Sequence, residues 1–329
     1  MVSLESPATE DCGIGLETVT VRFTNVGQLG ASGSQVNFRI NGGTTVTAPY
    51  NNTIDPGDTV TFSFPQQVDF SQIGTYDLEV WVSNTGDTIP ANDSVNQTIN
   101  HVKEVIAYPY RENFEEGPGG WAAIGDISSW QYGIPVNPII LGGANGIHTW
   151  ITNSTGNYLP FENSFVESPC FNFSNAPSGL WFSMYIWWET QVPWDGATVQ
   201  YTINDGQSWI QLGNANPNWF SSEFIAGLPG GSAEGWSGSS GAYKQVSAPL
   251  PSVLQGQPKV RFRIAFASNN AIENNGISFD DIVIGVPPPV DLGNDRFFCE
   301  GDTLSIGLSD VTYSWSTGAS TDYIVLNSV

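Results

Sequence analysis

Short runs of alternating apolar and polar residues, separated by turn residues, constrain this chain most. The alternation is clear in residues 18–23, 36–40, 60–64 and 78–82. A period of two residues is typical of β-strands that have one buried face. Gly (36) and Pro (21) fall between these runs, and no stretch shows the period of an amphipathic helix. We therefore predict an all-β fold that begins with an antiparallel sandwich.

The charge balance excludes several functions. The chain carries 32 acidic and 9 basic residues among 329, for a net charge of −23. The chain has too few Lys and Arg residues to form a nucleic-acid-binding face, and its negative net charge disfavours binding to anionic lipid. No apolar run is long enough to insert into a membrane. Residues 1–11 lack a signal-peptide pattern, so we expect the interior of a longer exported polypeptide with an added start codon; a cytoplasmic protein is the alternative.

Cysteine and histidine are scarce. Cys12, Cys170 and Cys299 lie far apart and show no C-x-x-C spacing, which argues against a zinc site or a redox motif. The two histidines leave few nucleophile–base pairs. Adjacent Glu115 and Glu116 could do acid–base chemistry, but the strand with two alternating Glu residues that is typical of concanavalin-like glycosidases is absent. We predict no enzymatic activity.

The first hundred residues carry a set of short turn motifs in a particular order. These are Thr-Asn-Val-Gly at 24–27, Pro-Gly-Asp at 56–58 and Gly-Thr-Tyr at 74–76. This segment resembles the Ig-like, adhesion-related modules of bacterial surface proteins. The resemblance implies an Ig-like sandwich over residues 1–106 that serves mainly as a spacer.

The C-terminal part starts with three prolines. Residues 287–289 form a stiff linker that separates neighbouring modules. Residues 290–329 resemble the first strands of a second Ig-like or PKD-like module, of a type found in gliding-motility-associated, type IX secreted proteins. In that family a later cysteine pairs with the one seen here at Cys299. The resemblance therefore implies an incomplete module and an unpaired Cys299.

The central block opens with Glu-Asn-Phe-Glu-Glu-Gly at 112–117, followed by Trp121, and closes with Gly-Ile-Ser-Phe-Asp-Asp-Ile at 276–282. This ordered set resembles the MAM-like jelly rolls, which include the cleaved-adhesin modules of gingipain-type proteins. The disulfides of animal MAM domains are missing, so the bacterial branch fits better. The resemblance implies a jelly roll over residues 107–286.

The same resemblance implies a calcium site, because the first and last strands of such jelly rolls are neighbours. The implied ligands are Glu115 and Asp281, with Asp280 and Glu116 as alternates. Two carboxylates about 5 Å apart near a surface repel by roughly 3 kcal/mol, whereas Ca²⁺ seeks six to eight oxygen ligands. A structural calcium ion would turn that repulsion into attraction. The alternative is that Asp280 and Asp281 only cap an exposed strand end.

Aromatic residues suggest a second kind of site. In residues 180–188 the side chains of Trp181, Tyr185 and Trp187 share one face of a strand, opposite a fully apolar face. The candidates for stacking on sugars are Trp187, Trp194, Trp219 and Trp236. The alternative is that these rings cover the sandwich. Residues 202–209 resemble an Asp-box hairpin, in which Trp209 is expected to stabilise a turn.

Together these observations predict a non-catalytic, calcium-stabilised segment of a large secreted or cell-surface bacterial protein. Its function would be adhesion or the structure of a filament. Its partners would be a glycan, a protein surface or neighbouring copies in that filament. The alternatives are a carbohydrate-binding accessory region of a secreted protease or glycosidase, and an architectural repeat that contacts only its neighbours.

Overall fold

The structure is a computed structural model in which two compact units are distinguished. It describes residues 2–7, 10–72, 74–216, 218–287, 302–305, 313, 315 and 318–326. Unit 1 comprises Met1–Val105 and unit 2 comprises Ile106–Val329. Among the described residues, no helix has the length and apolar character needed to cross a bilayer.

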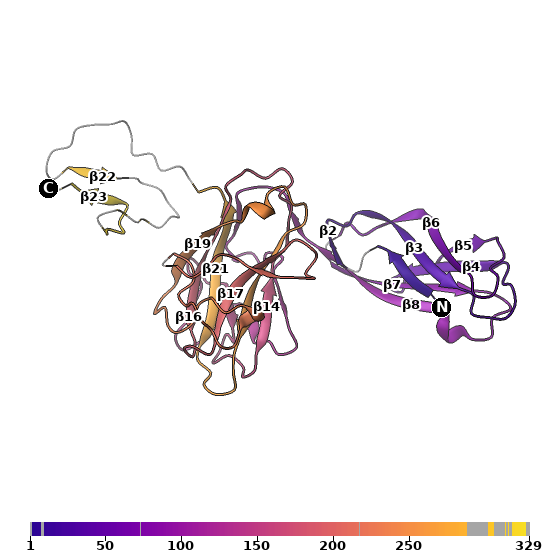
Figure 1. Ribbon diagram of the computed structural model, residues 1–329, viewed down its shortest axis with the longest axis horizontal. Helices are drawn as coiled ribbons and strands as arrows, with labels where there is room; N and C mark the ends of the chain where they lie inside the picture. Colours follow the sequence, from indigo (N-terminus) through magenta and orange to yellow (C-terminus); the bar gives the residue numbers. More distant parts are fainter. Residues whose placement is uncertain are drawn as a thin grey trace. The chain divides into compact units, whose positions relative to one another are not determined.

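Unit 1 contains two β-sheets (Figure 1). One has the strand order β1-β3-β6, and the other has the order β2-β8-β7-β4-β5, in which β2 runs parallel to β8. A short 3₁₀ helix, η1 (Pro90–Asn92), precedes β8. The strands are β1 (Val2–Ser6), β2 (Glu10–Cys12), β3 (Leu16–Thr24), β4 (Ser34–Ile40), β5 (Val46–Tyr50), β6 (Thr59–Asp69), β7 (Gly74–Ser83), β8 (Ser94–Val102) and β9 (Glu104–Val105).

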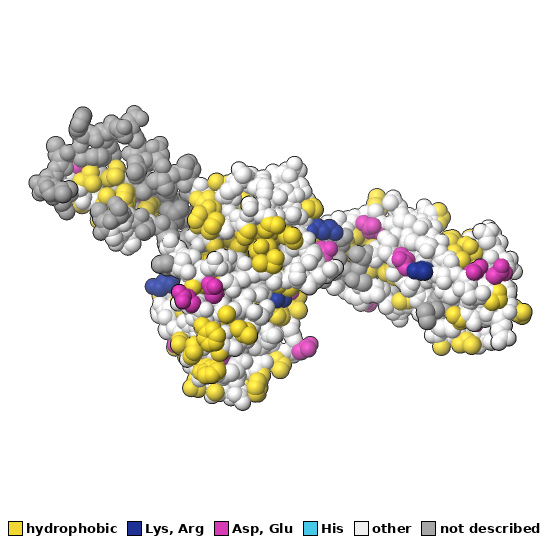
Figure 2. Space-filling model, viewed as in Figure 1, with side chains coloured by type: hydrophobic (Ala, Val, Ile, Leu, Met, Phe, Trp, Pro, Cys, Tyr) yellow, Lys and Arg dark blue, Asp and Glu magenta, His cyan; other side chains and the backbone are white. Residues whose placement is uncertain are grey.

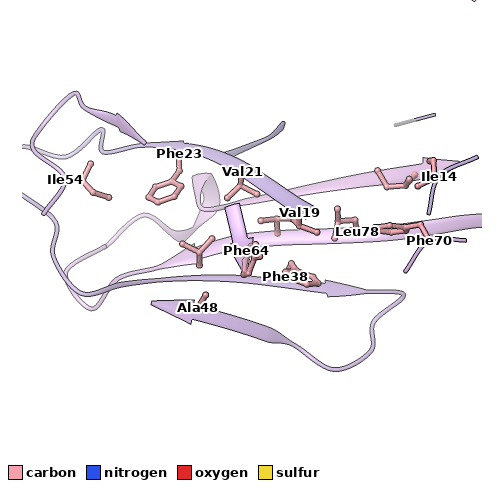
Figure 3. Packing of buried hydrophobic residues seen from close by; sticks show 13 residues of the cluster. Ile14, Val19, Val21, Phe23, Phe38, Ala48, Ile54, Phe64, Phe70 and Leu78 are labelled. Carbon is pink, nitrogen blue, oxygen red and sulfur yellow. The ribbon is translucent and has the colours of Figure 1, made fainter. Parts of the chain in front are cut away.

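The core of unit 1 is formed by the apolar residues of the alternating runs. Val19, Val21 and Phe23 of β3 are buried, while Thr20 and Arg22 between them are not. Phe38 and Phe64 meet edge to face with ring centroids 4.6 Å apart, as the close view of the core illustrates (Figure 3). The period of two in the sequence thus places one face of each strand in the core.

Unit 2 is also built from antiparallel strands. Two 3₁₀ turns, η2 (Pro229–Gly231) and η3 (Ser252–Leu254), lie in its loops. Its strands are β10 (Tyr110–Glu112), β11 (Ala122–Ile124), β12 (Trp130–Gly133), β13 (Thr149–Thr152), β14 (Asn163–Glu167), β15 (Cys170–Phe171), β16 (Trp181–Glu189), β17 (Gly196–Thr202), β18 (Ile210–Gln211), β19 (Lys244–Pro249), β20 (Arg261–Ala267), β21 (Gly276–Gly285), β22 (Thr303–Ser305) and β23 (Tyr323–Val325).

Two sheets dominate unit 2 and enclose its core. The six-stranded sheet has the order β12-β13-β21-β16-β19, with β10 also paired to β21, and the five-stranded sheet has the order β11-β14-β20-β17-β18. Phe262 and Phe266 of β20 are buried, as is Phe279 of β21. Phe266 and Phe279 both contact the ring of Trp130. The inward side chains of the two sheets therefore share one aromatic core.

Strand β21 changes partners along one edge, and this change positions the candidate site. Residues 282–284 pair with β10, whereas residues 278–279 pair with β13. Asp280 and Asp281 fall between these two pairings, where the register with β16 also shifts. Asp281 has a φ of 48°, in the left-handed region, as the added residue of a bulge can have. The segments that follow β10 and precede β13 therefore both meet β21 at these two aspartates.

These observations confirm the predicted all-β fold class. They also confirm the two faces of the aromatic strand, because Phe182, Met184 and Ile186 are buried while Trp181 is partly exposed. Cys12 and Cys170 are each disulfide-bonded. Prolines 288–289, most of residues 290–329 and Cys299 lie outside the described residues, which include only β22, β23 and a few neighbours there.

Candidate functional site

One loop of unit 2, residues 142–148, gathers three of the predicted carboxylates. The backbone N–H of Ala144 donates to Asp280 Oδ2 at 2.7 Å, and the side-chain amide of Asn145 donates to Asp281 Oδ2 at 2.6 Å. The backbone N–H groups of Ile147 and His148 both donate to Glu115 Oε1 at 2.9 Å. The structure therefore brings Glu115, Asp280 and Asp281 to a single short loop.

Asp280 is the unusual member of this group, because its side chain is 0% exposed. Its Oδ1 accepts the backbone N–H of Asp281 at 2.7 Å. Burial, and then the nearby charge of Asp281, raises the pKa of Asp280 to about 7. A carboxylate buried in this way is costly unless a cation lies beside it. The alternative role of Asp280 as part of an exposed strand end is wrong.

Glu115 has a different environment. Its Oε1 accepts two backbone N–H groups, and its Oε2 lies 3.2 Å from His148 Nδ1. The backbone N–H of His148 is the main cause that holds the pKa of Glu115 below its usual value. His148 also stacks on Tyr132, whose hydroxyl donates to the Phe114 carbonyl at 2.6 Å. Glu115 thus anchors the loop to the segment after β10.

A buried polar network supports the other side of the loop. The Tyr243 hydroxyl lies 2.6 Å from Ser278 Oγ and donates to the Gly142 carbonyl at 3.1 Å. Ser278 is wholly buried and lies 2.9 Å from Thr149 Oγ1. Burial is the main cause that raises the pKa of Tyr243 to about 12. Neighbouring strands therefore hold the start of the loop in place.

Two glycines of the loop allow this close packing. A Cβ at Gly143 would overlap Asp280 Oδ2 and would lie 2.7 Å from the His148 carbonyl oxygen. Both oxygens therefore face the same small space in front of Gly143. Gly146 has a φ of 143°, and a Cβ there would overlap Glu115 Oε1. The Gly-Gly-Ala-Asn-Gly sequence at 142–146 was the signal for this loop, although none of its residues was among the predicted site residues.

The donor set at this loop consists of oxygen atoms, which fits Ca²⁺ chemically. The carboxylate of Asp280 accepts hydrogen bonds from the backbone N–H groups of Ala144 and Asp281, and the backbone N–H of Asn145 also acts on it. Glu116, by contrast, is exposed. Over the described part of the chain, no three His, Cys, Asp or Glu side chains gather closely enough to hold a metal ion by themselves. A cation here would need backbone carbonyl oxygens such as that of His148.

The four tryptophans that were predicted to stack on sugars differ in how far they are buried. Trp219 and Trp236 are 2% and 0% exposed, and their ring centroids lie 5.1 Å apart. Rings buried in this way cover the sandwich and cannot stack on a sugar, so the stacking role is corrected for these two. Trp187 is partly exposed and packs against Tyr243, with its Nε1 unpartnered. Trp194 is 49% exposed and remains a candidate.

Trp194 belongs to a loop cluster at one end of the sandwich. The cluster is organised by Asp195, which is 1% exposed and accepts hydrogen bonds from the Tyr158 hydroxyl and the Asn269 backbone at 2.7 and 2.8 Å. Burial raises the pKa of Asp195. The Gly227 N–H donates to the Trp194 carbonyl at 2.8 Å. Hydrophobic side chains also gather on the face of unit 2 that Figure 2 shows, with few Lys or Arg among them.

Several large apolar side chains of this loop cluster are exposed. They are Phe161 (63%), Val192 (63%), Trp194 (49%), Phe224 (57%), Leu228 (45%) and Ile272 (54%). Their loops are hydrogen-bonded to one another, for example from the Phe161 N–H to the Asn269 carbonyl and from the Ala226 N–H to the Pro193 carbonyl, both at 2.8 Å. The loops that carry these exposed apolar side chains are therefore tied to one another by backbone hydrogen bonds.

Unit 1 has a surface pocket of its own. Its volume is about 640 Å³, and its lining includes Leu29, Asn84, Asp87, Ile89 and Asp93. Burial, and then the charge of Asp87, raises the pKa of Asp93. All the predicted site residues belong to unit 2, so this pocket coincides with none of them.

Sequence similarity to known proteins covers part of the chain. No family model matches the chain. Over 156 residues it is 28% identical to Bacillopeptidase F of Bacillus subtilis (strain 168), a match that covers 44% of this chain and 10% of that protein. The chain therefore spans about a tenth of the length of this curated relative.

The matches among solved structures include an adhesin domain and a carbohydrate-binding module. The K1 cleaved adhesin domain of Lys-gingipain from Porphyromonas gingivalis W83 is 17% identical, with a TM-score of 0.35; the match covers 55% of this chain and 99% of that one. A carbohydrate-binding module of the β-sandwich superfamily is 15% identical, with a TM-score of 0.34; the match covers 86% of this chain and 95% of that one.

Proposed function

We propose that unit 2 is a non-catalytic, extracellular binding module that serves adhesion and is stabilised by calcium. The observation that carries this proposal is the hydrogen-bonded loop cluster around the buried Asp195, with its exposed apolar side chains. Exposed apolar patches rimmed by polar groups typically mark sites of macromolecular contact. The disulfide-bonded Cys12 and Cys170 support an oxidising, extracellular environment.

The surroundings of the His148 ring bear on the non-catalytic part of the proposal. His148 is the histidine closest to the predicted carboxylates, and its ring faces Glu115 and Tyr132. Within the described ranges, no Ser, Thr or Cys side chain is hydrogen-bonded to the His148 ring. A nucleophile that His148 activates as a general base would need such a contact.

The calcium ion would lie between β21 and the loop 142–148. Asp280 and Asp281 would supply carboxylate oxygens, and the His148 carbonyl oxygen, which faces the same space before Gly143 as Asp280 Oδ2, would supply a backbone oxygen. Glu115 would position the loop through its two backbone hydrogen bonds. Bound calcium would offset the cost of the buried Asp280 charge and join β21 to the segment before β13.

Calcium titration of the Asp280→Asn variant tests this ion site. At about 100 times the dissociation constant, a ligand stabilises by about 2.7 kcal/mol, which for unit 2 is a rise in melting temperature of roughly 5 to 10 °C. We expect this rise for the parent chain and for the matched variant Glu116→Gln, and none for Asp280→Asn. In EDTA at pH 8 the variant should remain folded. Equal melting temperatures of the parent with EDTA and with calcium would sink the proposal.

A glycan array tests the contact surface. We expect Trp194→Ala to abolish binding without lowering the melting temperature, because the ring is 49% exposed. Trp181→Ala is the matched control, since Trp181 is 37% exposed at the start of β16, outside the loop cluster. Array binding that survives Trp194→Ala would count against the loop cluster as the contact surface.

A second candidate function is an accessory region of a secreted peptidase. The match to a protein named Bacillopeptidase F supports it. A peptidase domain in the same open reading frame would favour this candidate. A frame composed only of β-sandwich modules would favour adhesion.

A further inference from the structure

The outer face of the five-stranded sheet holds an arginine clamped between two aromatic rings. Arg263 lies on the central strand β20, and its guanidinium carbon is 3.9 Å from the ring centroid of Phe165 on β14. The same guanidinium carbon is 4.3 Å from the ring centroid of Trp209, which lies just before β18. Two stacked rings fix the plane of the guanidinium.

A hydrogen bond holds the Nε edge of the Arg263 guanidinium, whereas the edge with the two terminal NH₂ groups is available for a ligand. Arg263 Nε donates to Gln200 Oε1 at 2.7 Å. The amide of Gln200 is itself held, since it donates to Ser232 Oγ at 2.8 Å and to the Gly230 carbonyl at 3.0 Å. Arg263 is 9% exposed. Within the described part of the chain, its two terminal NH₂ groups have no hydrogen-bond partner.

The local charge is opposite to that of the whole chain. Arg261, two residues before Arg263 on the same face, forms an ion pair with Glu167. Glu167 is also the carboxylate whose charge acts on Arg263. Two guanidinium groups therefore face one carboxylate, in a chain with a net charge of −23. Burial lowers the pKa of Arg263 to about 10, so it remains a cation at neutral pH.

We propose that this clamped guanidinium binds the carboxylate of an acidic saccharide. Two N–H groups on one side of a guanidinium match the two oxygens of a carboxylate, and a side chain that is already held loses little entropy on binding. The flanking rings of Trp209 and Phe165 supply apolar surface for a sugar ring. The sequence indicated only a turn-stabilising role for Trp209. This site therefore includes none of the residues that the sequence predicted for calcium or sugar binding.

The site is separate from the calcium loop and from the loop cluster around Asp195. It shares no residue with Glu115, Asp280 or Asp281, and none with Trp194. Failure of the calcium or loop-cluster proposal would therefore leave this one standing, and the reverse also holds.

The test is calorimetric titration of the full chain with a galacturonic acid trimer, with a neutral galactose trimer beside it. We expect the acidic trimer to bind and the neutral trimer to bind at least 10-fold more weakly. Arg263→Lys keeps the charge but loses the paired donors, so it should weaken binding of the acidic trimer at least 10-fold. The matched variant Arg111→Lys, at an exposed position on β10, should bind as the parent does.

Three outcomes would overturn the proposal. They are no binding of the acidic trimer to the parent, equal binding to Arg263→Lys, and binding of a glutamate tripeptide as tight as that of the trimer. The last result would assign the site to acidic peptides. If Arg263→Lys does not fold, Trp209→Phe supplies the second variant, which keeps a ring on the guanidinium but offers less area, and it should bind the trimer about 3-fold more weakly.

Discussion

The outer faces of the two sheets of unit 2 carry buried charges of opposite sign. On the six-stranded sheet, Asp280 is buried beside Asp281 and is approached by N–H groups of a glycine-rich loop. On the five-stranded sheet, Arg263 is buried between two rings, and two guanidiniums face one carboxylate. The difference teaches that a strongly acidic chain can still present a local cation. Net charge therefore describes solubility and repulsion between chains better than it describes a site.

The largest expected effect is a dependence of stability on pH in the absence of calcium. The pKa of Asp280 is about 7 in the folded state, against about 3.9 for an unfolded chain. Between pH 4 and pH 7 the Asp280 carboxyl is protonated in the folded state but ionised in the unfolded state. Its contribution to the free energy of unfolding is therefore fully present below about pH 4 and falls as the pH rises to about 7. We expect a loss of about 4 kcal/mol in the free energy of unfolding, because each of about three pKa units corresponds to about 1.4 kcal/mol.

Urea denaturation in EDTA, followed by tryptophan fluorescence, measures this effect, since most of the tryptophans lie in unit 2. Asp280→Asn should flatten the curve between pH 4 and 7. Glu115 has the opposite sign, because its lowered pKa contributes stability that is lost as the solution becomes acidic. If the stability of Asp280→Asn depends on pH as that of the parent does, Asp280 is not the cause of the pH dependence.

A smaller effect is expected from Gly143→Ala. The added Cβ would overlap Asp280 Oδ2 and crowd the His148 carbonyl, so the loop must move away from β21. We expect a cost of about 2 kcal/mol in calcium buffer, together with weaker calcium binding. Gly156→Ala is the control, because a Cβ there meets one atom at an ordinary 3.7 Å. Equal melting temperatures for the two variants would contradict the close contact.

The smallest effect concerns the basic face. Phe165→Leu removes one of the two rings on Arg263 and should cost about 1 kcal/mol in thermal unfolding without ligand. Phe224→Leu is the matched control, because Phe224 is 57% exposed and should tolerate the change. A loss of several kcal/mol in Phe165→Leu would indicate that the ring serves the core more than the guanidinium.

The strand pattern was predictable from the sequence, and the convergence of the carboxylates was predictable in part. Residues 180–188 alternate in burial as their period of two predicts. Strands β10 and β21 are neighbours, as the family resemblance implied for the first and last strands of the predicted jelly roll, and Glu115 and Asp281 both contact the loop 142–148. The identity of that loop and the full burial of Asp280 were not foreseen, because both depend on where β21 changes partners.

The aromatic residues show the same limit. Trp219 and Trp236 lie in Gly-, Asn- and Ser-rich segments, which suggested exposed loops, yet those loops fold back over the sandwich and bury both rings. Trp209 and Arg263 are 54 residues apart in the sequence and meet only through the pairing of β18 and β20 with β17. The spacing of the two residues in the sequence does not predict such a contact.

The sequence by itself determined the all-β class, the inward face of alternating strands such as β3 and β16, and the acidic character of the chain. These follow from local alternation and from composition, which require no knowledge of distant partners. The tertiary structure alone decided which charges are buried and which side chains meet across the sheets. The physical reason is that desolvation and close contact depend on the residues that strand pairing and loop packing bring together.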